Sequence, residues 1–229
     1  MNDLPLPPAA PSATLAAGPV RRPISFRGTR LAAAMAKKLA STGIAPNTIS
    51  FCGPVFSLIG GIALWCVPSK SVALSAMLLL AGALMIMMRG LCNVFDGMVA
   101  IEHGRRTKSG ELYNELPDRF SDFFTMAGAG FLVPHYGWLG WTAAALAIIT
   151  AYVRALSGAM GAGQHFIGPM QKTHRMAVIA AALVVSAILT ILHQPIHWVM
   201  AAALVIVIVG CLATIVIRAR KIIAVVETP

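Results

Sequence analysis

Several apolar runs of this 229-residue chain approach the length needed to cross a lipid bilayer. A membrane-spanning helix needs about 20 mostly apolar residues, because the hydrocarbon core of a bilayer is about 30 Å thick. Inside that core the backbone amides find no water, so each span is expected to be a helix. The sequence therefore predicts an all-α integral membrane protein. The six predicted transmembrane helices are 48–67, 71–100, 111–133, 137–160, 174–193 and 196–217.

The composition and the placement of charge agree with a membrane protein. The chain is 58% hydrophobic and 11% charged, whereas soluble domains carry about 25% charged residues. A net charge of +10 is also typical of nucleic-acid-binding proteins, but here the basic residues lie at the ends of the predicted spans and in their connections. Such a distribution indicates cytoplasmic loops beside anionic lipid. We therefore expect membrane lipids as partners and no nucleic acid.

The basic residues and the tryptophans predict the same topology. With the N-terminus in the cytoplasm, only Lys70 of the eighteen Lys and Arg residues falls on the outer side. The tryptophans lie near the outward ends of the spans, as an interfacial aromatic belt requires; they are Trp65, Trp138, Trp141 and Trp198. We expect a multi-pass protein of a bacterial inner membrane with both termini in the cytoplasm. An organelle membrane is the alternative.

The segments outside the spans have a different character. Six prolines among alanines and serines predict a disordered N-terminal tail. Leu31, Met35 and Leu39 then recur every four residues with basic residues on other faces, which predicts an amphipathic interfacial helix on the cytoplasmic membrane surface. A solvated basic linker is the alternative. The expected divisions are a disordered tail at 1–23, a juxtamembrane helix at 24–42, a six-helix transmembrane domain at 43–218 and a basic C-terminal tail at 219–229.

Acidic residues are concentrated where the second predicted span ends and the third begins. Six of the eight acids of the chain lie there, and they are Asp96, Glu102, Glu111, Glu115, Asp118 and Asp122. Acids inside a hydrophobic protein are costly unless they bind cations or do chemistry. The simpler alternative is a set of interfacial ion pairs between helix-end acids and the neighbouring basic residues Arg105, Arg106, Lys108 and Arg119.

The spacing of these polar residues places them on two helix faces. Asn93, Asp96 and Ala100 are spaced i, i+3 and i+7 on the second span. On the third span, five polar residues project within an arc of about 100°; they are Glu111, Asn114, Glu115, Asp118 and Asp122. Oxygen ligands from two facing helices suit Mg²⁺ or Mn²⁺. The pattern predicts a cation site between the two spans, facing the cytoplasm.

The same stretch resembles the signature D-x-x-D-G-x-x-A-R-x8-G-x3-D-x3-D of the membrane CDP-alcohol phosphatidyltransferase family. The chain aligns with it without gaps at Asn93, Asp96, Gly97, Ala100, Ile101, Gly110, Asn114 and Asp118. The entry to the first span, Pro46-Asn47-Thr48-Ile49-Ser50, is similar to the family's P-N-x-[IL]-[ST]. The resemblance extends over roughly 40–217.

The resemblance implies a reaction and a set of roles. Family members transfer a phosphatidyl group from CDP-diacylglycerol, or a similar CDP-alcohol, to a small alcohol acceptor and release CMP; they are commonly homodimers. Two divalent ions, Mg²⁺ or Mn²⁺, would be held at Asn93, Asp96, Asn114 and Asp118. The nucleotide would contact Asp96, Gly97, Ala100 and Gly110, and Asp118 would be the catalytic base that accepts the proton of the acceptor hydroxyl.

Three residues depart from the signature. Asn93 and Asn114 replace two of the four acidic residues, and Ile101 replaces the arginine. An amide oxygen still binds a hard cation but adds no charge, so the four positions offer −2 instead of −4. Either the site holds one ion, or the substrate recruits the second; Glu111 or Glu115 are candidate compensating ligands. A catalytically silent relative that binds lipid or nucleotide is the alternative function.

Basic residues of the fourth and fifth spans are candidates for the acceptor side. Arg154 lies deep in an apolar run, and Lys172 and Arg175 open the fifth span. Because Lys and Arg are the usual partners of phosphate, they predict a pocket for a phosphorylated acceptor such as glycerol 3-phosphate. For Lys172 and Arg175, an ordinary excess of positive charge on the cytoplasmic side is the alternative.

Overall fold

The computed structural model describes residues 29–67, 70–102 and 109–228, apart from the side chains of residues 101, 102 and 111. Within these ranges helices joined by turns and loops are present and strands are not, so the predicted all-α class is confirmed. The predicted N-terminal tail, residues 24–28 of the interfacial helix and the basic turn at 103–108 lie outside the described residues. The helices are α1 (Arg30–Ser41), α2 (Pro46–Cys66), α3 (Val72–Glu102), α4 (Gly110–Gly130), α5 (Trp138–Ala159), α6 (Lys172–Ile191) and α7 (His197–Val226).

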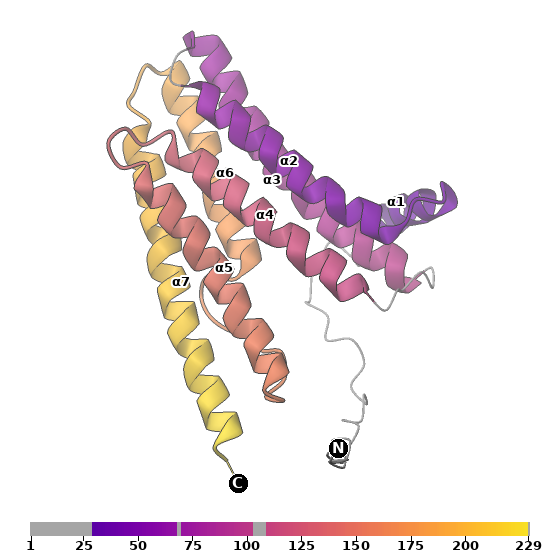
Figure 1. Cartoon of the computed structure of the whole chain (residues 1–229). Coiled ribbons are helices and arrows are strands. Elements are labelled where there is room, and N and C mark those ends of the chain that lie inside the picture. Colours follow the sequence, from indigo (N-terminus) through magenta and orange to yellow (C-terminus); the bar gives the residue numbers. More distant parts are fainter. Residues whose placement is uncertain (1–28, 68–69, 103–108, 229) are drawn as a thin grey trace, which may run out of the picture.

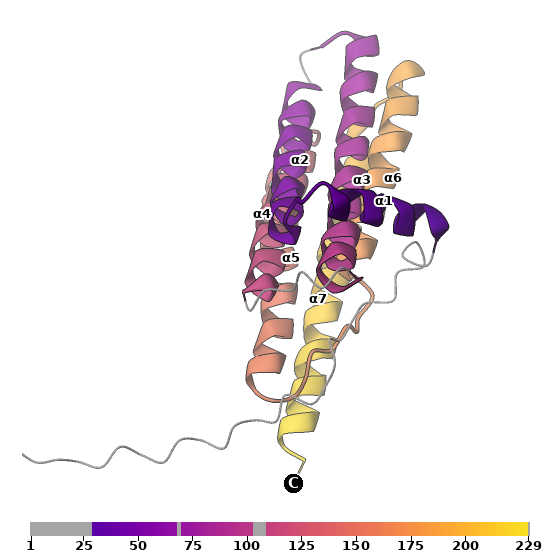
Figure 2. The same ribbon diagram turned by 90° about the vertical axis from the view of Figure 1, so that its right-hand side faces the viewer.

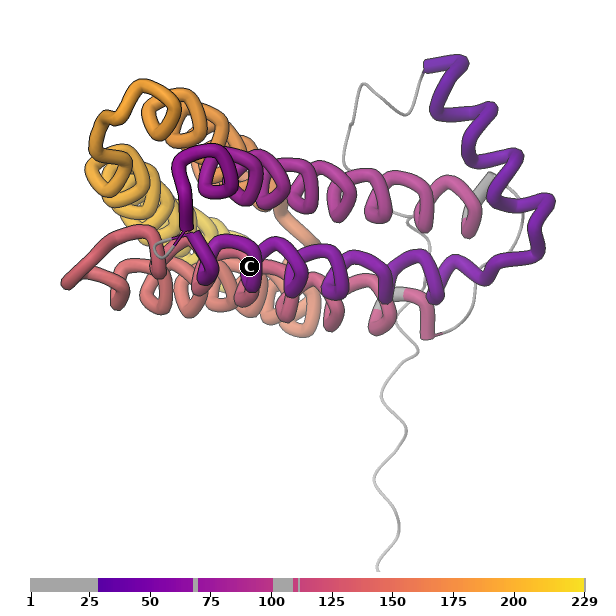
Figure 3. The backbone as a smooth tube through the Cα atoms, turned by 90° about the horizontal axis from the view of Figure 1, so that it is seen from above, coloured from indigo at the N-terminus to yellow at the C-terminus, as the bar shows by residue number. Residues whose placement is uncertain are grey.

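Helices α2 to α7 run alternately up and down through one elongated bundle (Figure 1). The connections α2–α3, α4–α5 and α6–α7 lie at the upper end of that view, while the α5–α6 connection and the C-terminus lie at the lower end. Packing joins α2 to α3 and α4, α3 to α6, and α5 to α4 and α7. Seen from above, α2, α3 and α4 run side by side on one side of the bundle (Figure 3). The C-terminus of α3 and the N-terminus of α4 therefore lie at the same end of this group of neighbouring helices.

Five of the described helices are long and apolar enough to cross a membrane: α2, α3 over Val72–Ala100, α5, α6 and α7. The remaining predicted span, 111–133, corresponds to α4, which is as long as α2, at 21 residues each. α4 differs from the other five helices in composition, because its first half carries acidic and basic side chains. Asp118 and Asp122 of this half are buried in the bundle and do not face outward.

The C-terminal helix α7 continues to Val226, nine residues beyond the end predicted at 217. Two buried residues explain the extension. Arg218 donates hydrogen bonds to the carbonyl oxygens of Ile167, at 3.0 Å, and Thr150, at 2.5 Å, and Ile222 is buried one turn later. The segment predicted as a basic tail is thus helical over most of its length.

Helix α1 lies crosswise to the bundle (Figure 2). Its N-cap is Thr29, whose hydroxyl accepts a hydrogen bond from the amide of Ala32. Ala32 and Ala36 are buried, and α1 packs on α3 near the end that carries the acids, while Leu31 and Met35 stay exposed. This division between a small buried face and a large exposed face suits a helix that lies at a membrane surface.

Glycines allow the central helices to approach closely. A Cβ on Gly128 of α4 would lie 2.6 Å from the Cα of Gly61 on α2, and a Cβ on Gly140 of α5 would lie 2.7 Å from the Cα of Gly130. Small residues at crossings are typical of helices that pack inside membranes. They bring α4 into contact with both neighbours and so fix the position of its acidic half.

The outside of the bundle is apolar along its length. Large hydrophobic side chains are exposed on several of its helices, among them Phe51, Val55, Met77, Leu84, Ile188, Ile206 and Val209. All four tryptophans are exposed and lie at the end opposite to the α3–α4 connection, at the C-terminus of α2 and the N-termini of α5 and α7. An apolar surface with tryptophans gathered at one end is typical of a membrane protein.

Candidate active site

The acidic half of α4 forms a stripe that takes cations from three other helices. Glu115, Asp118 and Asp122, spaced i, i+3 and i+7, make up this acidic stripe of α4. Their partners come from α3, α5 and α6, which converge on the same end of the bundle. Each acid contacts a different set of cations. The stripe can therefore be described at three levels of depth, with Asp122 deepest, Asp118 in the middle and Glu115 outermost.

The deepest level is a closed ion pair around Asp122. Arg89 of α3 binds one carboxylate oxygen at 2.6 Å, and Arg175 of α6 binds the other at 2.8 Å. Arg175 also donates to the hydroxyl of Thr150 and the carbonyl oxygen of Met170. Asp122 and Arg89 are fully buried. A buried carboxylate with two guanidinium partners fastens three helices together and has little capacity left for a substrate.

The middle level is built around Asp118. Its Oδ2 accepts from the ammonium group of Lys172, and its other oxygen lies 4.0 Å from Arg89. Arg119 lies 3.8 Å from Oδ2, on the more exposed side. The same ammonium group donates to Oδ1 of Asn93 on α3 at 2.7 Å. Lys172 therefore bridges α3 and α4 at the level of two residues predicted to bind metal.

The outermost level is half exposed. Glu115 pairs with Arg154 of α5 at 2.5 Å and with Arg119 at 3.6 Å. Arg154 also donates to the side chain of Gln164 at 2.7 Å and lies over the ring of Phe166, with its guanidinium carbon 5.1 Å from the ring centroid. The guanidinium group of Arg154 is thus held flat between a carboxylate, an amide and an aromatic face.

Asp96 faces these levels from α3. Its Oδ2 accepts a hydrogen bond of 2.6 Å from the hydroxyl of Ser50, at the start of α2. Asp118 and Lys172 are near enough to interact with Asp96 electrostatically. Among the residues that the structure describes, Asp96 has no ion pair within 4.0 Å, although it is only 5% exposed. It is therefore the buried carboxylate of this site that still has capacity for a cation.

The segment before α6 is anchored on α7, which sets the direction of Lys172. The amide of Met170 donates to the hydroxyl of Thr214 at 2.9 Å. Gly168 has a φ of +108°, and a Cβ there would lie 2.5 Å from Cγ2 of Thr214. Only glycine adopts this backbone conformation without strain. Together with the bonds of Arg218, these contacts fix the start of α6 relative to α4.

The predicted site residues are brought together in part. The structure brings together Asn93, Asp96, Asp118 and Lys172. At the same end of α3 lie Gly97 and Ala100, which are partly buried. Asn114 is exposed, and Gly110 is the first residue of α4. The side chain of Glu111 lies outside the described residues, while Glu115 pairs with Arg154. Arg154 and Arg175 lie beside the acids of α4, as described above.

Three features of the site were not predicted. The bond from Ser50 to Asp96 joins the two segments that carry the resemblance, but nothing in their spacing shows it. Arg218 has the position of an ordinary cytoplasmic-end arginine in the sequence and is buried in the structure. Asp122 belongs to the polar face of its span, yet it is a structural ion-pair partner. Burial could have been suspected from its apolar neighbours Phe123 and Phe124.

The donor set fits one divalent ion better than two. In the described part of the chain, no three His, Cys, Asp or Glu side chains come together as a metal-binding group. Of the four predicted ligands, Asn93 and Asp118 already give oxygens to an ammonium group, and Asn114 is exposed. Asp96 remains as a carboxylate whose burial requires a cationic or hydrogen-bonding partner. An oxygen-rich site of this kind suits Mg²⁺ or Mn²⁺.

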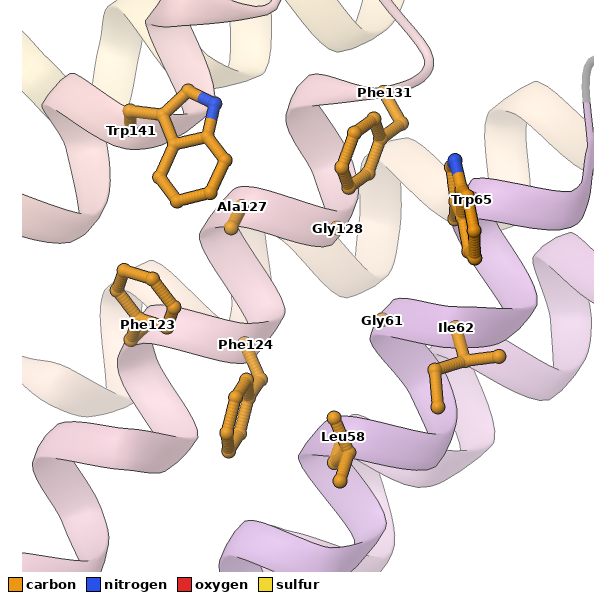
Figure 4. Close-up of a pocket in the computed structure, with 10 residues that line it drawn as sticks. All are labelled: Leu58, Gly61, Ile62, Trp65, Phe123, Phe124, Ala127, Gly128, Phe131 and Trp141. Carbon is orange, nitrogen blue, oxygen red and sulfur yellow. The ribbon is translucent and has the colours of Figure 1, made fainter.

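An apolar pocket of about 290 Å³ lies between α2, α4 and α5, near the end that carries the tryptophans (Figure 4). Its lining contains no titratable side chain, and on α4 it begins at Phe123, directly after Asp122 of the acidic stripe. Its shape and lining are suited to a hydrocarbon chain rather than to chemistry. The lining residues are Leu58, Gly61, Ile62, Trp65, Phe123, Phe124, Ala127, Gly128, Phe131 and Trp141.

Comparison with known proteins identifies the fold. No family model and no curated protein sequence matches the chain. Solved structures do match, and they show the fold: the bundle has the fold of a CDP-alcohol phosphatidyltransferase. Three of the matching structures are of the phosphatidylinositol phosphate synthase PgsA1 of Mycobacterium tuberculosis.

The similarity covers most of both chains. The synthase with CDP-DAG bound matches with a TM-score of 0.69 at 20% identity, over 85% of this chain and 94% of the other. Its complex with manganese and citrate matches at 0.68 and 19% identity, over 83% and 88%. The apo form matches at 0.65 and 20% identity, over 82% and 94%. At this level of identity the likeness shows the fold, and the fold implied by the resemblance is thereby confirmed.

Proposed function

We propose that this protein transfers a phosphatidyl group from CDP-diacylglycerol, or a similar CDP-alcohol, to a small alcohol and releases CMP. One observation carries the proposal. Asp96 of α3 and Asp118 of α4 lie near each other at one end of a bundle whose fold matches that of a CDP-DAG-bound synthase. Carboxylates from two helices beside several buried cations form a site suited to a diphosphate and to the cations that bind it.

The residues of this chain divide the work by position. Asp96, with Gly97, Ala100 and Gly110 around it, contacts the nucleotide and its diphosphate. Asn93, Asp96, Asn114 and Asp118 are the proposed metal positions, with Glu111 and Glu115 as compensating ligands. When bound, Mg²⁺ or Mn²⁺ neutralises the phosphate oxygens and stabilises CMP as the leaving group. Asp118, which Lys172 and Arg119 hold in place, accepts the proton of the acceptor hydroxyl.

The acceptor side is the cationic wall formed by Arg154, Lys172 and Arg175. Arg154 is the candidate best placed for a phosphorylated acceptor such as glycerol 3-phosphate, because its partner Glu115 is half exposed and Phe166 orients its guanidinium plane. Arg175 forms an ion pair with Asp122 and stabilises this group of cations through that pair. We propose the cytoplasmic side of a bacterial inner membrane as the location of the site, with both termini on that side.

The membrane arrangement completes the proposal. We propose that α4 also crosses the membrane, which gives six spans in all, because its buried acids face the bundle and its second half, from Phe123 onward, is apolar. The transmembrane domain then comprises 43–218, preceded by the interfacial helix at 24–42 and the tail at 1–23, and followed by the segment 219–229. A homodimer is the proposed assembly.

The test is release of CMP by purified protein in detergent with CDP-diacylglycerol, Mn²⁺ and a panel of alcohols that includes glycerol 3-phosphate. We expect release that depends on one acceptor, and we expect Asp118→Asn to abolish it while the protein stays folded. The control is Glu227→Gln, which makes the same kind of change at an exposed residue beyond α7 and should leave turnover unchanged. Turnover by Asp118→Asn would remove Asp118 as the base.

A catalytically silent relative is the second candidate, and a specific contact favours it. The ammonium group of Lys172 already binds one carboxylate oxygen of Asp118, the proposed general base. Such a protein would still bind the nucleotide. Binding of CDP-diacylglycerol without release of CMP, for every acceptor tested, would support this second function.

A further inference from the structure

Lys172 lies between two predicted metal ligands, a position that its proposed roles beside Asp118 and the acceptor do not explain. Its ammonium nitrogen lies 2.7 Å from Oδ1 of Asn93 and binds Oδ2 of Asp118. One partner belongs to α3 and the other to α4. An ammonium group with three donors, held by oxygens from both helices, has the same ligands that a divalent cation would use here.

The surroundings of Lys172 orient its partners toward it. The amide nitrogen of Asn93 donates to the carbonyl oxygen of Arg89 at 3.0 Å, which turns the amide oxygen toward the lysine. Lys172 is the first residue of α6, where the helix dipole disfavours a cation. It is 8% exposed. A lysine buried at that end of a helix is stable only if its oxygen partners compensate, so its place depends on Asn93 and Asp118.

The distribution of charge leaves room for one divalent ion. The buried carboxylates Asp118 and Asp122 face Lys172, Arg89 and Arg175, so three monovalent cations already neutralise two acids. Asp96 is the buried acid of the site with no ion pair in the described ranges. A second divalent ion beside Asp118 would have to displace Lys172 or lie against it, and both are costly in a buried site.

We propose that the ammonium group of Lys172 takes the place of one divalent cation, so that the site binds a single Mg²⁺ or Mn²⁺ ion with Asp96 as its carboxylate ligand. The inference rests on the proposed function, which assigns cation binding to this site. It divides that binding role between one divalent metal ion and the ammonium group of a lysine. Lys172 is then a positioning residue that holds Asn93 and Asp118 together.

A simpler explanation for a low metal count is the loss of two carboxylates alone. The two explanations differ for the variant Asn93→Asp. If the missing charge is the sole cause, restoring that carboxylate should restore the second ion. If Lys172 occupies the cation position, the new carboxylate will pair with the ammonium group, and the second ion will bind only when the lysine is also removed.

The experiment counts Mn²⁺ bound to purified full-length protein in detergent, by electron paramagnetic resonance, with and without CDP. We expect at most one ion per chain for the wild type and for Asn93→Asp, and one additional ion for Asn93→Asp combined with Lys172→Met. The additional site should have a Kd at least about tenfold below that of any second site in Asn93→Asp, because a like charge has left contact distance. Thermal unfolding shows that each variant is folded.

Two results would overturn the proposal: two ions bound by the wild type, or a second ion gained by Asn93→Asp alone. Should the Lys172→Met combination fail to fold, Lys172→Gln keeps a polar group at the same place and is expected to give the same gain. Because the gain of an ion is measured without turnover, it stands even if no acceptor supports release of CMP. Conversely, turnover with two bound ions would leave the proposed function intact and remove the role of Lys172.

Discussion

The contact between Gly128 of α4 and Gly61 of α2 allows a quantitative prediction. A Cβ added to Gly128 would lie 2.6 Å from the Cα and 3.3 Å from the carbonyl oxygen of Gly61. Favourable contacts between carbon atoms need about 3.5–4.0 Å. The obstructing atoms belong to the backbone, so no side chain can rotate away. Gly128→Ala therefore requires α2 and α4 to separate by about 1 Å.

Two opposing effects set the magnitude. Overpacking at a tight contact typically costs about 1–3 kcal/mol. Alanine in a helix interior gains back roughly 0.5–1 kcal/mol relative to glycine, because it loses less conformational freedom on folding. We expect Gly128→Ala to lower the free energy of unfolding by about 1–2 kcal/mol, which corresponds to a fall in Tm of roughly 2–8 °C for a chain of this size.

The assay is thermal unfolding of purified protein in one detergent at a fixed heating rate. The matched control is Gly53→Ala, on the same helix as Gly61, where a Cβ would meet Oγ of Ser121 at 3.6 Å and Cγ of Arg89 at 3.8 Å, which are ordinary contacts. Gly53→Ala should keep or raise the Tm. If Gly128→Ala is as stable as the wild type while the control behaves normally, α2 and α4 do not approach as closely as this reasoning requires.

Two further predictions concern residues that support the site. Asp122→Asn leaves two buried guanidinium groups facing a neutral amide and should cost about 3–5 kcal/mol, measured as loss of folded, monodisperse protein in detergent; a wild-type yield and Tm would contradict a structural role for the ion pair. Gly168→Ala combines a strained φ of +108° with a clash at Cγ2 of Thr214 and should cost about 1–3 kcal/mol in thermal unfolding. Thr214→Ser removes that methyl group and should recover part of the loss, and no recovery would show that the contact with Cγ2 is not the source of the cost.

The helices could be predicted because their signals are local. Runs of about 20 apolar residues fix where a chain must be helical in a membrane, and α2, α3, α5 and α6 begin and end within two residues of the predicted spans. For α4, the acids that lower its hydropathy are the same residues that reveal one polar face. The end of α7 was missed because the burial of Arg218 depends on Ile167 and Thr150, which are distant in the sequence.

The pairing of charges in the site could not be predicted from the sequence. Lys172 and Asp118 are 54 residues apart, and Lys172 and Asn93 are 79 apart. A lysine at the start of a span is equally compatible with a phosphate contact, a lipid contact or an ion pair. The sequence predicted Lys172 for the acceptor, and in the structure its ammonium group contacts Asn93 of α3 and Asp118 of α4. Only the packing of α6 on α3 distinguishes these roles.

The charge pattern of the site also bears on the order in which its ligands bind. Lys172 and Arg175 open α6 at a helix end that already favours anions, and with Arg89 they outnumber the acids that they face. A divalent ion that entered first would add charge to a site that is already neutralised. A diphosphate adds about two negative charges and makes the same ion favourable beside Asp96. Electrostatics therefore favour entry of the metal with the nucleotide or after it, and the replacement of two acids by Asn93 and Asn114 strengthens that preference.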